Sequence, residues 1–198
     1  MYGLTIVTPA AAPVTAAELR DRLRINGTAE DGDLTEFLAS AVERFEDDTG
    51  RPVLTTGYRQ DLAQWPAGGL IVLGRGGVTA VTAVKRYLAD GSTETLAADQ
   101  WRADLLTPPA RVQLAAVPAR VTTAAGIAVS PVGCVEFTAG WANAAAVPKQ
   151  VLTALKLLAG HWYENREAHT EKKLAELPDG WARVVSRYKL GLSGSWGQ

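Results

Sequence analysis

Apolar residues recur at helical spacing in four stretches, two near the start of the chain and two near its end. The clearest is residues 34–45, where apolar side chains stand at i, i+3, i+4, i+7, i+8 and i+11. Residues 15–25, 148–167 and 181–188 repeat the pattern, and the stripe of 148–167 is wide enough to face a core. The pattern therefore predicts two amphipathic helices near each end of the chain.

Polar residues and a glycine add detail to these helices. Thr15 stands three residues before Glu18, and Asp33 stands three residues before Glu36. This is the spacing of a capping box, in which each residue bonds the other's backbone N–H, so Thr15 and Asp33 are predicted to cap the first two helices. Gly160 lies inside the third helix, where it costs about 1 kcal/mol relative to Ala. We expect it to let a neighbouring helix approach closely.

Between the helical regions, short runs rich in Val, Thr, Tyr and Trp are separated by Gly, Pro and Asp, which predicts β-strands. They lie at residues 53–65, 70–73, 78–88, 93–96, 100–104, 111–114 and 135–141. Asp90-Gly91 predicts a hairpin, because these residues suit the φ > 0 positions of a type I′ turn. Residues 115–133 have weak periodicity and are expected to form a long surface loop or a partly formed ribbon.

The order of elements is therefore two helices, a β region of roughly ninety residues, and two more helices. Each helix has an apolar face that needs a partner, so the four are expected to pack together. We predict an α+β fold, with a four-helix bundle-like α domain of residues 1–51 and 146–189 and an inserted antiparallel β module of residues 52–145. Residues 190–198 are expected to form a flexible C-terminal tail.

Composition narrows the function classes. The chain has 198 residues, of which 47% are apolar, enough for one domain with a real core. No run approaches about 18 consecutive apolar residues, so no membrane span is expected, and the first residues lack the basic region of a secretory signal. The net charge of −1 argues against tight, general DNA binding. Cys134 is the only cysteine, which excludes an internal disulfide and fits a reducing compartment.

A search for catalytic, metal or cofactor motifs is negative. His161 and Glu164 have the i, i+3 spacing of di-metal bundles, but such sites need the motif twice. Cys134 begins a predicted strand, where a small buried residue is expected rather than a nucleophile. Residues 74–77 read Gly-Arg-Gly-Gly but lack the Lys-Ser/Thr and the helix that make a phosphate loop. We therefore expect no enzyme activity and no cofactor.

The C-terminal end combines apolar and basic residues. The tail carries Leu190, Leu192 and Trp196, which are too few to pack a core and too apolar for a purely solvating tail. Aromatic anchors are typical of interfaces, so Trp196 is either a partner contact or simply exposed. Arg183, Arg187 and Lys189 form a basic group, which is either a solvated helix face or an anchor for an acidic partner surface.

Several motifs, in this order, resemble one family. They are V-T-A-A-E-L-R-D-R-L-R-I, A-S-A-V-E-R-F-E-D-D-T-G-R-P, the Asp-Gly hairpin, F-T-A-G-W before V-P-K-Q-V-L, and H-W-Y-E-N-R-E before L-P-D-G. Over nearly its whole length the chain resembles the head–tail connector (adaptor) proteins of tailed bacteriophages, including the adaptors of phage-like gene transfer agents. Residues 115–133 depart from the family pattern, which passes more directly into F-T-A-G-W.

The resemblance implies a structural role. Such adaptors assemble in the bacterial cytoplasm as a ring under the portal protein, in the neck of the particle. They extend its DNA channel and dock the next neck or tail component, a stopper or tail terminator. A ring matching a twelve-fold portal is expected, with DNA passing through the channel without specific binding. Family precedent places the C-terminal segment against the portal, which here means Tyr188, Leu190, Leu192 and Trp196.

Two further expectations remain open at the level of sequence. Glu43, Glu46 and Asp47 could give the DNA channel an acidic lining, or they could form an ordinary solvated face. The alternative function is a small-ligand or carbohydrate-binding β module on a helical stalk, as a tail accessory protein. That alternative predicts that Trp65, Trp101 and Trp141 group on one exposed face of the sheet.

Overall fold

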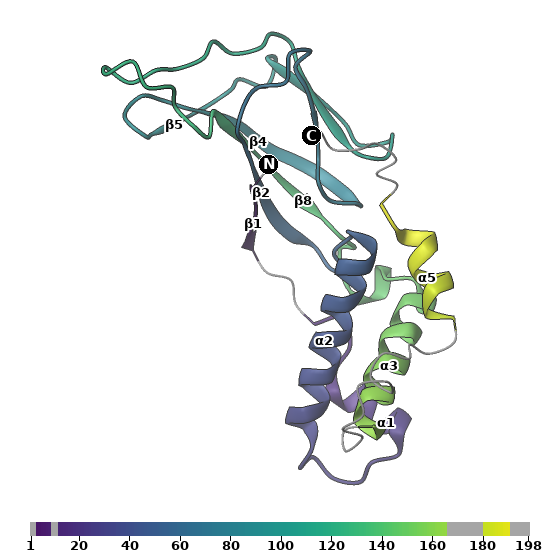
Figure 1. Ribbon diagram of the computed structural model, residues 1–198. Coiled ribbons are helices and arrows are strands. Elements are labelled where there is room, and N and C mark those ends of the chain that lie inside the picture. The colour runs from purple at the N-terminus through teal and green to yellow at the C-terminus, as the bar shows by residue number, and fades with distance from the viewer. Residues whose placement is uncertain (1–2, 9–11, 166–179, 191–198) are drawn as a thin grey trace. The chain divides into compact units, whose positions relative to one another are not determined.

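The computed structural model describes residues 3–8, 12–165 and 180–190, which form an α+β fold with antiparallel sheets (Figure 1). The predicted fold class is therefore confirmed. The chain divides into two compact units. We call residues 12–54, 141–165 and 180–189 the helical unit, and residues 3–8 and 55–140 the sheet unit.

The helices of the helical unit lie where the periodicity placed them. They are α1 (Ala16–Leu23), α2 (Asp31–Thr49), α3 (Lys149–Glu164) and α5 (Trp181–Tyr188), with a 3-10 turn at Ala144–Ala146. Leu38, Phe45 and Leu155 are buried in one hydrophobic cluster, and Trp162 packs against it. The apolar faces of the early and late helices thus share one interior, as the sequence predicts.

The predicted capping box at the start of α1 is present. The N–H of Thr15 donates to Glu18 Oε2 at 3.0 Å, and the N–H of Glu18 donates to Thr15 Oγ1 at 3.3 Å. The first of these bonds lowers the pKa of the Glu18 carboxyl, and the nearby Lys156 ammonium lowers it further. Val14 and Leu19 on either side of the cap are both buried, so the cap also sets the direction in which the chain enters α1.

Replacing Thr15 with Ala is expected to lower the free energy of unfolding by about 1 kcal/mol, because one N–H of the first turn loses its acceptor. Thermal unfolding should show a fall in Tm of about 3 °C relative to the wild type. The Glu18 part of the cap is complete above the carboxyl's ordinary pKa and is lost as the pH falls through its lowered value in the folded protein. Acid should therefore weaken this bond in the wild type and in the Ala variant alike, because the donor is the backbone N–H of residue 15, which both proteins have. Thr153→Ala, on the exposed side of α3, removes no cap and should not lower Tm, because Ala favours the helix.

The start of α2 differs from the prediction. The helix begins at Asp31 with Glu30 as its N-cap residue, and Asp33 lies inside the first turn instead of capping it. Long-range contacts explain the shift: Arg20 of α1 pairs with Asp31 at 2.6 Å, and the hydroxyl of Tyr163 in α3 donates to the Glu30 carboxylate. Tertiary contacts therefore start the helix about one turn earlier than the capping pattern of the local sequence predicts.

Gly160 in α3 allows the close approach of a neighbouring helix that the sequence predicts. A Cβ at this residue would lie 3.2 Å from Leu23 Cδ2, so the missing side chain lets α1 pack closely on α3. A methyl group here would force the Leu23 side chain to move, although the helix backbone itself would favour Ala.

The sheet unit contains two antiparallel sheets. The five-stranded sheet has the order β1-β2-β8-β4-β5, and the three-stranded sheet has the order β3-β7-β6. Their bounds are β1 Gly3–Thr8, β2 Thr56–Leu62, β3 Leu70–Val72, β4 Val78–Tyr87, β5 Thr93–Thr95, β6 Trp101–Asp104, β7 Arg111–Leu114 and β8 Gly133–Ala139. Side chains of both sheets enter one buried cluster, in which Tyr58 stacks on Phe137 at 5.6 Å between ring centroids.

One strand of this unit corrects the predicted domain assignment. Residues 3–8, which the sequence placed with the helices, form β1 at the edge of the larger sheet and pair with β2 from Gly3↔Asp61 to Thr8↔Gly57. Ile6 and Val7 are 55% and 60% exposed. Because these side chains are not buried, the sequence shows no clear strand pattern for β1. Its partner lies about fifty residues later, and backbone pairing rather than hydrophobic pattern holds it in place.

The turns between strands follow the sequence in part. Residues 121–129 form a small ribbon, with an isolated bridge between Thr122 and Ala128, which agrees with one of the two alternatives for the long loop. At the predicted hairpin, Gly91 has φ +83° but Asp90 does not have a positive φ, so the turn is not type I′. The N–H of Gly91 instead bonds the carbonyl of Leu88, giving a three-residue loop with glycine in the left-handed position.

Candidate docking surfaces

The two titratable residues considered as catalytic candidates belong to different units of the structure. Cys134 is buried in β8, and burial raises the pKa of its thiol, which disfavours the nucleophilic thiolate. His161 is half-buried at the end of α3 beside Asn165. Among the described residues, no three His, Cys, Asp or Glu side chains gather closely enough to hold a metal ion. In the same part of the chain, no helix has the length and apolar character needed to cross a membrane.

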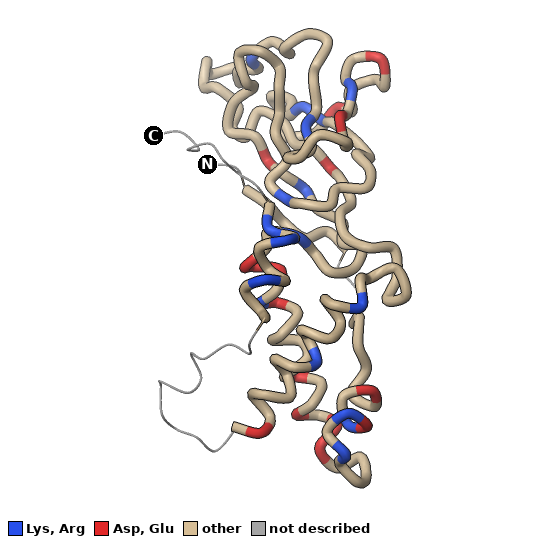
Figure 2. Tube along the Cα trace, turned by 90° about the vertical axis from the view of Figure 1, so that its right-hand side faces the viewer, with Lys and Arg blue, Asp and Glu red and all other residues tan. Residues whose placement is uncertain are grey.

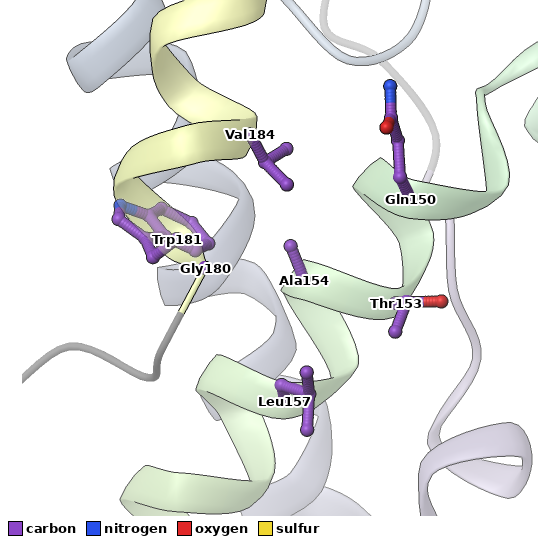
Figure 3. A pocket seen from close by; sticks show the side chains of 7 residues that line it. All are labelled: Gln150, Thr153, Ala154, Leu157, Gly180, Trp181 and Val184. Carbon is purple, nitrogen blue, oxygen red and sulfur yellow. The ribbon is translucent and has the colours of Figure 1, made fainter.

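An apolar hollow lies between α3 and the start of α5 (Figure 3). Its volume is about 250 Å³, and its lining carries no charged side chain. The lining residues are Gln150, Thr153, Ala154, Leu157, Gly180, Trp181 and Val184. Leu157, one of these residues, is 40% exposed. The hollow has the chemistry to receive an apolar side chain of another protein.

The hollow described in the sheet unit does not favour the alternative of a small-ligand-binding β module. Pockets for small ligands usually hold roughly 300–1,000 Å³. A hollow in the sheet unit beside residues 115–118 measures about 200 Å³. The tryptophans do not group as that alternative requires either: Trp65 and Trp101 pack against the cluster of the sheet unit, whereas Trp141 packs against that of the helical unit.

The residues expected to contact a portal lie partly outside the described structure. Leu192 and Trp196 fall outside the described residues, and Leu190 is half-buried. Tyr188 is not part of a free tail, because its ring packs against Phe45 and Trp141 and its hydroxyl accepts a bond from Gln150. The segment expected to contact the portal therefore starts from a residue that is anchored in the helical core, and its assignment stays a prediction.

The three acidic residues expected to line a channel have unlike surroundings. Glu43 and Asp47 are exposed on α2. Glu46 is half-buried, and its Oε1 accepts a hydrogen bond from the N–H of Val53 at 2.8 Å, which ties the chain after α2 to the helix. A channel-lining role stays a prediction for all three, and Glu46 also has this structural role, which sequence reasoning missed.

Asp48 is a further residue that the sequence did not single out. Its Oδ2 accepts the indole N–H of Trp181 at 2.9 Å and pairs with Arg44 at 3.0 Å. These bonds, together with the edge-on contact of Phe45 and Trp181, fasten α5 to α2. No local pattern shows this link, because its members are separated by 133 residues.

In the described residues, Lys and Arg are interspersed with Asp and Glu along the trace of both units (Figure 2). Within this mixture, α2 and α5 each carry exposed charges of one sign without an ion-pair partner among the described residues. These are Glu36, Glu43 and Asp47 on α2, and Arg183 and Arg187 on α5.

Solved structures with similar folds come from gene transfer agent (GTA) particles. A chain in the virion of a native GTA particle matches with a TM-score of 0.75 and 28% identity, covering 96% of this chain and 98% of that chain. A chain in the neck of an empty particle, computed with C6 symmetry, matches with a TM-score of 0.75 and 27% identity over the same shares. A chain in the neck of a native particle, computed with C12 symmetry, gives 0.71 and 28%, again over 96% and 98%. No protein-family model and no curated protein sequence matches this chain.

These neighbours agree with the resemblance seen in the sequence. The matches extend over almost the full length of both partners, so the helical and sheet units occur together in the solved chains as well. The expectation of a neck protein of a phage or gene transfer agent is confirmed at this level.

Proposed function

We propose that this protein is a head–tail adaptor, which forms a ring under the portal of a phage or gene transfer agent particle and extends its DNA channel. The observation that carries the proposal is the likeness to chains in the virion and neck of GTA particles over 96% of the sequence. The two neck structures were computed with six-fold and twelve-fold symmetry, which supports a cyclic assembly. The protein is structural and carries out no reaction.

The C-terminal segment is the proposed portal contact. α5 is fixed to the helical core through Trp181 and Tyr188, so the residues that follow it start from a rigid base. Leu190, Leu192 and Trp196 supply apolar side chains of the kind that act as anchors in interfaces. The opposite end of the ring would then be free to receive the next neck or tail component. Assembly takes place in the bacterial cytoplasm, before the protein reaches its final place in the neck.

Deleting residues 191–198 is expected to abolish binding to rings of the portal protein from the same particle, while circular dichroism and Tm stay those of the wild type. Co-sedimentation of the purified proteins measures the binding. Replacing Leu192 and Trp196 with Ser should give the same loss at full chain length, whereas Ser193→Ala and Ser195→Ala should bind normally. Portal binding by the truncated protein at wild-type strength would overturn the assignment of the tail.

A further inference from the structure

The exposed face of α2 is acidic along most of its length. Glu36, Glu43 and Asp47 follow one another at spacings of seven and four, which places them on one side of the helix, opposite the buried Leu38 and Phe45. None of the three has an ion-pair partner among the described residues. Glu43 and Asp47 are like charges at i, i+4, an arrangement that destabilises an isolated helix.

The exposed face of α5 carries the opposite charge. Arg183 and Arg187 stand at i, i+4, point away from the buried Trp181, and have no ion-pair partner in the described part of the chain. Lys189 follows directly after the helix and is exposed as well. The side of α5 that faces solvent is therefore a basic surface about two turns long.

Both helices carry charge at the end where their own dipole opposes it. α2 has Asp47 in its last turn and no basic residue there, although a helix C-terminus favours cations. α5 has Arg183 in its first turn and no acidic residue there, although a helix N-terminus favours anions. Each arrangement costs some stability in the isolated subunit, which a contact with opposite charges would offset.

The two faces point in different directions. α2 and α5 pack on one another through Phe45 and Trp181, whose rings meet edge-on at 6.2 Å. Because their buried sides face each other, their exposed sides are turned away from each other, and Figure 1 shows α2 along one side of the helical unit and α5 along the other. A subunit with an acidic side and a basic side is built for a head-to-tail contact, in which one face meets the other face of the next copy.

We propose that the acidic face of α2 in one copy of this chain docks on the basic face of α5 in the next copy, and that this contact closes the ring. The inference rests on the proposed function, since it needs a cyclic assembly. It places Glu43 and Asp47 in a contact between subunits instead of on the wall of the channel. Complementary charges would set the orientation of neighbouring subunits and suppress other contacts, and the contact should weaken as salt is added.

Charge reversal on either face tests the contact. Glu43→Arg/Asp47→Arg makes both faces basic, and Arg183→Glu/Arg187→Glu makes both acidic. Each double variant should lower the fraction of subunits found in rings at least tenfold, measured by mass photometry and negative-stain imaging with portal rings present. The first variant should also raise the Tm of the free subunit, because it places cations at the C-terminal end of α2. Lost assembly with raised Tm cannot come from unfolding.

Mixing the two variants gives a result specific to this contact. In an equimolar mixture, the basic α2 face of one variant meets the acidic α5 face of the other, and the reverse pairing is also complementary. Two proteins that do not assemble alone should therefore form rings of alternating subunits, which have an even number of members. The control variant Asp21→Arg/Glu164→Arg changes the net charge by the same amount as Glu43→Arg/Asp47→Arg, but at exposed positions of α1 and α3. It should assemble like the wild type.

The outcomes separate this contact from the proposed function. Rings formed by each charge-reversed variant alone, or no rings in the mixture, would overturn the contact while leaving the adaptor function intact. A wild-type protein that forms no ring with or without portal would overturn the adaptor function, and this contact with it. Normal ring formation by Glu43→Arg/Asp47→Arg, combined with slowed passage of DNA, would return these residues to the channel wall.

Discussion

Replacing Phe45 with Ala is expected to lower the free energy of unfolding of the helical unit by about 4 kcal/mol. The Phe45 side chain is completely buried, and its ring contacts those of Trp181 and Tyr188. Its removal would leave a cavity at the point where α2 holds α5. Urea unfolding followed by circular dichroism gives the change in free energy, and hydrogen exchange shows where protection is lost.

Exchange should increase in α2, α3 and α5 and stay unchanged in β2 and β8, because the two units have separate hydrophobic clusters. Phe45→Leu keeps most of the buried volume and should cost less than about 1.5 kcal/mol. If Phe45→Ala lost no more stability than Phe45→Leu, the contacts of the Phe45 side chain with Trp181 and Tyr188 would not hold the helical unit together. The Ala variant should also weaken ring formation, since it loosens the helix that carries Arg183 and Arg187.

Gly133→Ala is expected to destabilise the sheet unit by about 3 kcal/mol, because a methyl group has no room there. A Cβ at this residue would lie 2.5 Å from the carbonyl oxygen of Lys85 and 2.4 Å from the ring of Trp65. The Lys85 carbonyl belongs to the backbone of β4, which pairs with β8 next to this residue, so it cannot turn aside as a side chain can. Thermal unfolding and hydrogen exchange of β4 and β8 measure the effect.

Gly68→Ala is the matched control in the same unit. A Cβ at Gly68 would meet nothing within 4 Å, so the change should alter the free energy of unfolding by less than about 0.5 kcal/mol. Equal Tm values for the Gly133 and Gly68 variants would show that β4 and β8 can separate at Gly133 without loss. The Trp65 ring would then be able to move away from Gly133.

The two clusters also bear on the proposed function. In the proposed ring, each subunit would contact copies of itself and also different neighbouring proteins of the particle. In this chain the helical unit supplies charged faces of both signs and an apolar hollow, whereas the sheet unit presents structured loops. Leu106 is 95% exposed in a turn held by the Asp104 carboxylate, and Ile127 is 67% exposed at the tip of the ribbon. Single exposed apolar side chains are common on protein surfaces, so these two do not by themselves indicate an interface.

Local pattern was sufficient for most elements. The spacing of Leu34, Leu38 and Phe45 predicts α2, and the capping box at Thr15 predicts the start of α1, because helix periodicity and capping depend on residues within one or two turns. The runs rich in β-branched and aromatic residues likewise match the strands of the sheet unit. The resemblance to neck proteins of phage-like particles depends on the order of these same motifs, so it too is a property of the amino-acid sequence alone.

Long-range contacts decided the rest. The sequence could not show that residues 3–8 pair with β2, that Arg20 and Tyr163 draw the start of α2 back to Asp31, or that Glu46 is engaged by the N–H of Val53. It also could not show that the acidic side of α2 and the basic side of α5 face away from each other. Each of these depends on residues far apart in the chain, and only packing brings them together. Periodicity tells which face of a helix is buried, but the direction in which the other face points is set by the helix it packs against.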